Sequence, residues 1–352
     1  MSDIQTIRIL FIADTHLGYD LPFRPRIKRR RRGPEFFANL ERALVPALKH
    51  EVDCVLHGGD LLYRSKVPPR LAEMAFEPLK RVADQGVPVY LVPGNHERSA
   101  IPHNRYAIHP NIHIFDRPKT FLMRIGEFNL ALAGFPFIRH NIRNEFPGIL
   151  EQTDWLDAKA DGYVLCLHQS IEGARVGPVN YTFRYSPDVI KAADIPPQFA
   201  AVLAGHIHRF QILTRDLRGN SLPVPILYPG SIERTSFAEK DERKGFLTLE
   251  LKRTGPGSCR LERWVFHDLP VRPMRVLELH ASHIHSHELK AWITHHFEKL
   301  PADSVVRLNI HGNLSPEAEA IFRAPSLRTL TPTSMNVTPA FIEARRPFHK
   351  NR

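Results

Sequence analysis

The sequence is poor in cysteine and has no long apolar run. Its three cysteines, Cys54, Cys166 and Cys259, are odd in number and widely spaced, so they provide neither a disulfide framework nor a paired zinc-binding motif. No apolar stretch reaches the roughly 18 residues that a membrane span requires. Residues 1–5 carry an acid and lack the basic region that precedes a signal sequence. We therefore expect a cytoplasmic protein with no membrane partner, in which Cys54 and Cys166 are buried and reduced.

Acidic residues are too few to balance the basic ones. The chain has 48 Lys and Arg against 37 Asp and Glu, a formal net charge of +11. Seven basic residues lie within nine positions: Arg24, Arg26, Lys28, Arg29, Arg30, Arg31 and Arg32. Such a block attracts polyanions through counterion release, which favours nucleic acid as a partner over a neutral small molecule. A solvated loop without a partner is the alternative interpretation.

Five short apolar runs each end abruptly in a cluster of Gly, Asp, Asn or His. They are residues 7–13, 54–56, 87–92, 163–167 and 201–203. Helical periodicity in the stretches around 36–48 and 71–82 separates the first three runs, and this alternation predicts βαβ units. Ligands in such sheets bind beyond the carboxyl ends of the strands. The five polar clusters are therefore predicted to share one edge of the fold.

Strands dominate the chain after residue 128. Runs at 128–134, 226–228, 245–251 and 263–266 predict a second sheet stacked on the first, with helices outside. A proline-containing linker at 269–273 precedes a small α/β unit, with strands at 274–279 and 305–310 around a helix from about 286 to 300. The predicted domains are thus 1–268, a small α/β domain at 269–330, and a loosely ordered tail at 331–352.

The strand-end clusters contain seven predicted metal ligands. They are Asp14, His16, Asp60, Asn95, His168, His206 and His208. A single histidine after a strand is usually structural, so the metal interpretation depends on the whole set. Asp14 and His16, two apart in one turn, can chelate one ion with His208, whereas Asn95, His168 and His206 serve a second ion and Asp60 bridges both. Mixed oxygen and nitrogen ligands without thiolate favour Mn²⁺, Fe or Zn.

Two such ions point to hydrolysis of a phosphate ester. At a separation of about 3.5–4 Å they would lower the pKa of a bridging water, and the resulting hydroxide would attack the phosphate in line. The leaving oxygen then needs a proton. His96, next to the predicted ligand Asn95, is the candidate general acid, and Glu97 is expected to orient its ring. A structural role near the metal site is the alternative for His96.

At these residues the chain resembles the calcineurin-like metallophosphoesterase superfamily, and more narrowly the SbcD-type DNA double-strand-break-repair nucleases. The narrower resemblance rests on DTHLG at 14–18, LHQ at 167–169 and YPGSIER at 228–234. It implies a four-layer αββα sandwich with a small C-terminal α/β capping domain. It also implies manganese-dependent exonuclease or endonuclease activity on DNA. Many of these nucleases present the DNA phosphate with a histidine three positions after the bridging aspartate. Here that position is Tyr63, whose phenol could still donate a hydrogen bond.

The same resemblance implies partners. It implies a homodimer, for which the helix expected at about 69–85 is a candidate surface, and a coiled-coil ATPase of the SbcC type. Two other functions stay open: a phosphoesterase acting on small phosphodiesters, nucleotides or phosphoproteins, and a DNA-binding scaffold with weak catalysis. The arginine block argues against the first, and the complete ligand set argues against the second.

Several other signals do not predict sites. A histidine patch at the start of the last predicted helix contains His280, His283, His285 and His287. Glu288 is its only nearby carboxylate, so a solvated loop is the better interpretation. The sequence has neither a GxxxxGK[ST] loop nor a G-x-S-x-G turn, which excludes a P-loop NTPase and a serine hydrolase of the elbow type.

Overall fold

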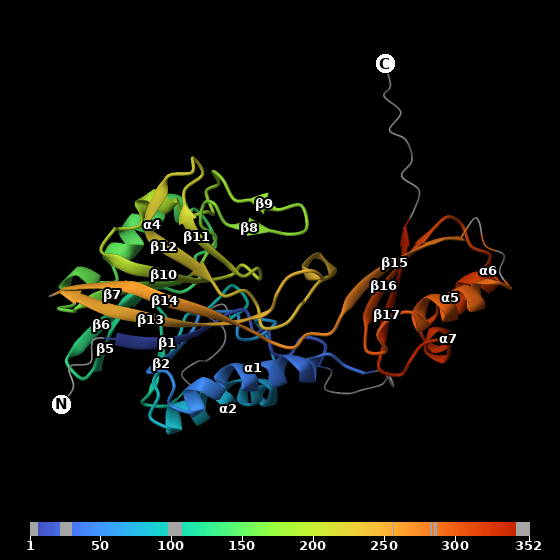
Figure 1. The fold of residues 1–352 in the computed structure, drawn as a ribbon, viewed down its shortest axis with the longest axis horizontal. Coiled ribbons are helices and arrows are strands. Elements are labelled where there is room, and N and C mark those ends of the chain that lie inside the picture. Colours follow the sequence, from blue (N-terminus) through green and yellow to red (C-terminus); the bar gives the residue numbers. More distant parts are fainter. Residues whose placement is uncertain are drawn as a thin grey trace, which may run out of the picture. The chain divides into compact units, whose positions relative to one another are not determined.

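The computed structural model describes residues 6–21, 30–97, 108–255, 257–281, 284 and 287–342 (Figure 1). These residues form two compact units. The first contains the described residues up to Leu21 and Arg32–Pro270, and the second contains Arg30, Arg31 and the described residues from Val271 onward. In the part of the chain that the structure describes, no helix combines the length and apolar character that a membrane crossing requires.

The first large sheet has the strand order β14-β13-β1-β2-β3-β4. Its strands are β1 (Thr6–Ile12), β2 (Cys54–His57), β3 (Val89–Leu91), β4 (Ile112–Ile114), β13 (Gly245–Gly255) and β14 (Ser258–Asp268). Strands β1 to β4 are parallel, and β13 and β14 are antiparallel additions beside β1. The expected βαβ arrangement is therefore present, and the ends of β1, β2 and β3 lie at one edge.

Two helices cover the outer face of this sheet. They are α1 (Gly33–Leu48) and α2 (Pro69–Asp84), which lie side by side in Figure 1. Each begins at a proline-containing first turn, where the missing N–H costs no hydrogen bond. Phe36 and Phe76 are fully buried against strand residues such as Leu10, so truncating either phenyl ring would cost about 3–5 kcal/mol.

The second large sheet has the order β11-β12-β10-β7-β6-β5. Its strands are β5 (Lys119–Ile125), β6 (Phe128–Gly134), β7 (Gly162–His168), β10 (Phe199–Gly205), β11 (Gln211–Arg215) and β12 (Ser221–Tyr228). Helix α4 (Ile142–Glu151) packs on its outer face. The remaining small elements of this unit are β8 (Arg175–Val176), β9 (Tyr181–Thr182) and the 3-10 turns η1 (Trp155–Asp157), η2 (Ala192–Asp194) and η3 (Phe237–Glu239).

The two sheets pack face to face. Alternate residues of β1 explain how: Ile9 and Phe11 point into the inner core shared with Leu203 of β10, whereas Leu10 faces the helices. Both faces of β1 are therefore buried, which is why its sequence is apolar almost throughout. The four-layer αββα sandwich predicted for this chain is confirmed.

The strands β13 and β14 correct one part of the sequence interpretation. The runs at 245–251 and 263–266 were expected in the second sheet, but β13 pairs with β1 in the first sheet. Leu247 and Leu249 of β13 still face the inner core. A strand with alternating apolar residues can turn the same side chains toward the inner core from either of the two sheets. Its sequence pattern therefore does not reveal which sheet it joins.

The second unit is a three-stranded parallel sheet with helices on one face. It consists of β15 (Met274–His280), β16 (Val305–His311), β17 (Asn336–Ile342), α5 (Leu289–Glu298), α6 (Pro316–Ile321) and α7 (Ala324–Thr329). Leu308 of β16 and Ile293 of α5 are fully buried in its core. Ser286, the expected start of the helix, lies outside the described residues.

The prediction of a loosely ordered tail at 331–352 is wrong for residues 336–342. These residues form β17, which pairs in parallel with β16 along its whole length. Pro339 lies within β17, which is an edge strand, where a proline can leave its missing N–H on the open side. Residues 343–352 lie outside the described part of the chain.

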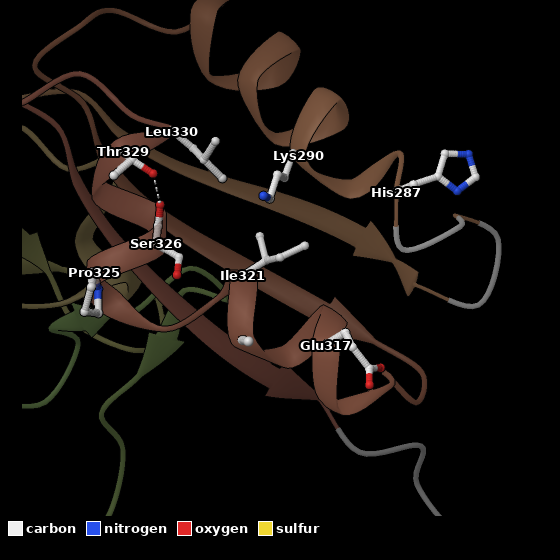
Figure 2. A pocket seen from close by; sticks show the side chains of 9 residues that line it. His287, Lys290, Glu317, Ile321, Pro325, Ser326, Thr329 and Leu330 are labelled. Carbon is white, nitrogen blue, oxygen red and sulfur yellow. Dashed lines mark hydrogen bonds between the residues drawn. The ribbon is translucent and has the colours of Figure 1, made fainter.

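A groove of about 780 Å³ opens on the second unit between α5 and the α6–α7 pair (Figure 2). Ile321 and Leu330 form part of its apolar wall, and Lys290, His287 and Glu317 supply its charged or titratable groups. None of the seven predicted metal ligands lines it. The chemistry predicted from the sequence therefore belongs to the first unit.

Candidate metal centre

The seven predicted ligands follow strands of both large sheets. Asp14 and His16 follow β1, Asp60 follows β2 and Asn95 follows β3; His168 ends β7, while His206 and His208 follow β10. Because β1, β2 and β3 are parallel, and β7 and β10 are parallel too, their carboxyl ends meet at one edge of each sheet. Residues separated by up to 194 positions thus come together, and the contacts below show how closely.

One group of side chains comes from the β1 and β10 loops. The Nε2 atoms of His16 and His208 lie 2.9 Å apart. Oδ1 of Asp14 lies 4.0 Å from Nε2 of His208. One ligand atom from each of the three side chains falls within 4.8 Å of the others, so the group could hold a metal ion.

A second group surrounds the amide oxygen of Asn95. Its Oδ1 lies 3.1 Å from Nε2 of His168 and 2.9 Å from Nδ1 of His206. Asp60 lies between the two groups, because its Oδ2 is 3.5 Å from His168 Nε2 and 3.9 Å from His16 Nε2. This is the position that a carboxylate shared by two cations would need.

The backbone at this edge is strained. Asp14, His16, Asp60 and His206 all have positive φ angles, of 50°, 45°, 52° and 87°. Each such conformation costs a non-glycine residue on the order of 1–3 kcal/mol, and such residues cluster at functional sites. Hydrogen bonds compensate locally: Asp14 N donates to Gly59 O at 2.9 Å, and His16 N donates to Asp60 O at 3.0 Å.

Two glycines allow the strand-end loops to approach one another. A Cβ on Gly59 would lie 2.3 Å from Nδ1 of His168, and a Cβ on Gly94 would lie 2.3 Å from Oδ1 of Asp60. Real Cβ atoms do not come that close to other atoms. The glycines that precede Asp60 and Asn95 in the sequence are therefore needed to bring the carboxylate, amide and imidazole together.

Burial shifts the pKa values of these groups in opposite directions. Burial raises the pKa of Asp14 to about 6, although His168 and His208 oppose the shift. Burial also disfavours the Asp60 carboxylate, but the neighbouring imidazoles, His168 above all, hold its pKa below the usual range. His168 is desolvated too, yet Asp60 raises its pKa to about 9, whereas burial and His168 lower the pKa of His206 to about 3. Such divergence within one cluster is typical of functional sites.

The donor set fits divalent cations. Carboxylate, amide and imidazole groups converge without any thiolate, a combination suited to Mn²⁺, Fe or Zn. The Nε2 atoms of His16 and His208 face each other. A neutral imidazole can donate from only one of its two nitrogens, so this part of the cluster has few hydrogen-bond donors for its acceptors. Among the described residues, the buried Nδ1 of His16 has no hydrogen-bond partner. Cys54 and Cys166 are buried in the inner core, as predicted, and are free.

The contacts of Glu97 differ from the sequence prediction that this residue orients the His96 ring. Its carboxylate accepts hydrogen bonds from the backbone N–H groups of Asp60 at 2.9 Å, Leu62 at 2.8 Å and Gly94 at 2.8 Å. The Nδ1 atom of His96 instead meets the main-chain oxygen of Tyr63. Glu97 therefore braces the Asp60 loop, and the main-chain oxygen of Tyr63 takes the place expected for Glu97 beside the His96 ring.

His96 lies at the same edge, with more solvent access than most of its neighbours. Its Nε2 is 3.8 Å from Oδ2 of Asp60, and its side chain is 31% exposed. Its ring centre lies 4.9 Å from that of His16. His16, Asp60 and His96 form a third group that could hold a metal ion, so the geometry allows two roles for His96, proton donor or ligand.

The predicted nucleic-acid-binding residues fall in different environments. Arg24, Arg26, Lys28 and Arg29 lie outside the described residues. Arg30 is exposed and Arg31 is partly buried. The ring centre of Tyr63 lies 6.0 Å from that of His16 and 5.9 Å from that of His96, which places it beside one predicted ligand and the candidate general acid.

Arg32 does not fit the predicted role. It is only 5% exposed, and its Nη2 donates to Glu233 Oε1 at 3.0 Å and to the main-chain oxygen of Arg234 at 2.8 Å. A guanidinium paired in this way braces the start of α1 and is turned away from solvent. In the sequence it is indistinguishable from its basic neighbours, since burial depends on the distant Glu233.

Sequence reasoning missed two residues that lie against the predicted ligands. Glu239 bonds the ring of His208, with 3.2 Å between Oε1 and Nδ1. The ring of Phe137 lies 5.5 Å from that of His206 and 6.0 Å from that of His168. No motif marks either residue, because each reaches the site only through the packing of a loop.

Comparison with known families agrees with this geometry. The calcineurin-like phosphoesterase family model matches residues 7–210, which include every strand-end cluster described above. The chain belongs to the calcineurin-like phosphoesterase family. Membership confirms the predicted superfamily and the predicted enzyme class, a metal-dependent phosphoesterase, and it implies divalent metal ions.

Relatives of this calcineurin-like phosphoesterase include archaeal proteins named DNA double-strand break repair protein Mre11. The protein from Saccharolobus solfataricus is 25% identical over 288 residues, covering 79% of this chain and 68% of its own. The protein from Haloferax volcanii is 28% identical over 276 residues, covering 77% and 54%, and the alignment with that from Methanopyrus kandleri covers 55% of the relative. The chain thus spans little more than half the length of most of these relatives, which support the SbcD-type resemblance.

A solved dimetal phosphatase from Danio rerio is a more remote neighbour. It is 13% identical, and the alignment covers 73% of this chain and 98% of the phosphatase with a TM-score of 0.46. That similarity is too low to bear on the site or the function.

Proposed function

We propose that this protein is a two-metal phosphodiesterase that cleaves the DNA backbone as an exonuclease or endonuclease in double-strand-break repair. The observation that carries the proposal is the convergence of Asp14, Asp60, Asn95 and the four predicted histidine ligands at the joint edge of two sheets. The names of the archaeal relatives and the block of basic residues support DNA as the substrate.

The ligands divide into two sets around Asp60. Asp14, His16 and His208 would hold one cation and Asn95, His168 and His206 the other, with Asp60 shared. When bound, two divalent cations, with Mn²⁺ the expected pair, supply the Lewis acidity that activates water and neutralises phosphate charge. The chain's contribution is the rigidity of the site, because the strained backbone and the two close-packed glycines fix the donors before any cation arrives.

His96 is the proposed general acid. The main-chain oxygen of Tyr63 accepts a hydrogen bond from its Nδ1, so the imidazolium form would deliver its second proton, the one on Nε2, to the leaving oxygen and would keep the Nδ1 proton. The backbone N–H of His96 donates to Oδ1 of Asp60 at 2.9 Å, tying the acid to the shared ligand. Proton donor and metal ligand would thus keep a constant separation during turnover.

Substrate positioning falls to Tyr63 and the basic block. The guanidinium of Arg64 lies 5.7 Å from the centre of the Tyr63 ring, so the phenol sits in a positive environment suited to a phosphate oxygen. The remaining basic residues of the block would contact the backbone phosphates without reading sequence. Replacing Arg29, Arg30 and Arg31 with Gln should weaken DNA binding and flatten its salt dependence, and an unchanged salt slope would return the block to the solvated-loop interpretation.

One assay separates this function from its alternatives. The purified protein with Mn²⁺ is offered linear DNA, hairpin DNA and bis-p-nitrophenyl phosphate, with EDTA and an Asp14→Asn variant as negative controls. Metal-dependent cleavage of DNA supports the proposal. Cleavage of the small ester alone would make the protein a phosphoesterase of small substrates, and DNA binding without any cleavage would make it a scaffold.

The proposed assembly is a homodimer that works with an SbcC-type coiled-coil ATPase. Both partners remain predictions from the resemblance. The outer face of α2, where Met74 is 41% exposed, is the candidate dimer surface.

A further inference from the structure

A buried carboxylate and a buried lysine lie behind His208, outside the set of predicted ligands. Glu239, the last residue of η3, is 7% exposed, and Lys244, which directly precedes β13, is 1% exposed. Removing a charged group from water is costly unless well-placed partners replace the water. The partners of these two side chains therefore show what the buried pair holds in place.

Glu239 is fixed by several donors besides the imidazole. Its Oε2 accepts from Lys244 Nζ at 2.6 Å. Its Oε1 accepts from Thr235 Oγ1 at 2.8 Å and from Ser236 Oγ at 3.2 Å, and the Nδ1 of His208 lies 3.2 Å from the same oxygen. Two hydroxyls and an ammonium thus orient the carboxylate, so its position does not depend on the histidine that it meets.

Lys244 holds the same histidine at a second point. Its Nζ donates to the main-chain oxygen of His208 at 2.9 Å and to Ser231 Oγ at 2.9 Å, and it lies 3.2 Å from Glu242 Oε2. Lys244 therefore holds the backbone of His208 directly and its ring through Glu239. Fixing both ends of a side chain removes its torsional freedom and sets the direction of the far ring nitrogen.

The contact also selects the tautomer of His208. An ionised carboxylate can only accept, so Glu239 keeps the proton on Nδ1. The Nε2 atom then faces Asp14 Oδ1 at 4.0 Å and His16 Nε2 at 2.9 Å. His16 differs, because its buried Nδ1 has no hydrogen-bond partner among the described residues. Of these two imidazoles, His208 is the one whose Nδ1, on the side away from the other predicted ligands, contacts a protein group.

We propose that Glu239, anchored by Lys244, is a positioning residue of the metal centre, which turns Nε2 of His208 toward the cation shared with Asp14 and His16. The inference rests on the proposed function, since it requires a cation at that group. Carboxylates that hold a metal-bound imidazole from behind typically change metal affinity or activity by about 10- to 100-fold. Glu239 touches no substrate in this scheme, and its effect passes entirely through His208.

Manganese titration of matched variants tests the proposal. Calorimetry and the EPR signal of free Mn²⁺ measure both sites in the wild-type protein, Glu239→Gln and Glu242→Gln. Glu239→Gln should weaken one of the two sites by about 10- to 100-fold and spare the other, and excess Mn²⁺ should restore turnover of bis-p-nitrophenyl phosphate. Glu242→Gln removes a carboxylate from the same lysine without touching His208, so its affinity should match the wild type.

Three results would overturn the positioning role. Wild-type affinity in folded Glu239→Gln is the first, and an equal loss in Glu242→Gln is the second. If Glu239→Gln does not fold, the tautomer is measured in the wild-type protein labelled with ¹⁵N-histidine and loaded with Zn²⁺, with His208→Gln assigning the resonance. A His208 that binds through Nδ1, or that lacks a proton there, is the third. Failure of the wild-type protein to bind any Mn²⁺ would instead sink the proposed function, so the two failures are distinguishable.

Discussion

The strand ends of the large sheets and the small sheet of the second unit are both rich in histidine, but they present it differently. In the first unit His16 and His168 are 2% and 0% exposed and come from different sheets. In the second unit His280 and His311 lie on adjacent strands, with their rings stacked 4.8 Å apart, and the side chain of His287 is 80% exposed. The difference is one of topology rather than of composition.

The carboxylates follow the same division. Asp60 is almost fully buried and lies near three imidazoles. In the second unit Glu278 accepts from His311 Nε2 at 2.6 Å, but it is 48% exposed and water can replace that contact. Among the described residues, every group that could hold a metal ion lies in the first unit. Histidines can form a metal centre when several chain segments bring them together in a buried cluster. The number of histidines close together in the sequence does not decide this.

Replacing the shared carboxylate should give the largest effect. We expect Asp60→Asn to lose both cations and at least about 10,000-fold in turnover, or ~5 kcal/mol of transition-state stabilisation, because an amide bridges two ions poorly. Turnover of bis-p-nitrophenyl phosphate and metal content by mass spectrometry measure this. Retention of two ions per chain would mean that Asp60 is not shared.

Removing the proposed acid should separate chemistry from binding. We expect His96→Ala to lower turnover by about 100-fold or more while two ions stay bound, because only proton transfer is lost. Turnover of a substrate whose leaving group needs no proton should fall less in this variant. If the metal content falls as well, His96 belongs to the group formed with His16 and Asp60 as a ligand.

A glycine pair tests whether close approach of the loops matters beyond backbone strain. Gly59 has φ +104° and its Cβ would meet His168, whereas Gly86 has φ +84° and meets nothing within 4 Å. We expect Gly86→Ala to cost about 1 kcal/mol of unfolding free energy from strain alone. Gly59→Ala should cost about 1–3 kcal/mol and also weaken the second cation site. Denaturant titration in EDTA and Mn²⁺ binding measure both; equal behaviour of the two variants would contradict the steric account.

Metal binding to the buried cluster should depend on pH. Desolvation lowers the pKa of His168, but Asp60, Asp14 and the carbonyl group of Gly58 together raise it to about 9, so His168 is protonated at neutral pH in the metal-free protein. A cation must displace that proton, and affinity should therefore rise up to about tenfold per pH unit between about pH 7 and 9. Below about pH 6 protonation of Asp14 adds a second competing proton. Calorimetry in buffers of different ionisation enthalpy counts the protons released, and a pH-independent affinity would contradict the linkage.

The histidines of the second unit should give the smallest effect. We expect His311→Gln to change the unfolding free energy by less than about 0.5 kcal/mol and to leave Mn²⁺ stoichiometry unchanged. A third bound Mn²⁺ that this substitution removes would abolish the contrast between the two regions.

The parts of the site that could be predicted share a local signal. A strand followed by polar ligands is indicated by an apolar, β-branched run that stops at a polar cluster, whatever the sequence of the rest of the chain. Asp14-Thr15-His16 and Gly94-Asn95-His96 are two such clusters. Asp60, His168 and His206 were found in the same way. The features of the fold that could not be predicted depend on partners distant in sequence: the pairing of β13 with β1, the strand β17, and the burial of Arg32 against Glu233.

Short segments of the chain thus specify the strand ends, the identity of the donors and the class of chemistry, because hydrophobic periodicity and ligand type are local properties. The packing of distant loops sets which nitrogen of His208 faces the other donors, which buried pair lies behind it, and that Glu97 holds a loop rather than a ring. Those outcomes depend on hydrogen bonds between residues such as Glu239 and His208, whose geometry is set when separate loops pack together. No short segment contains that information, since burial and orientation arise from the fold as a whole.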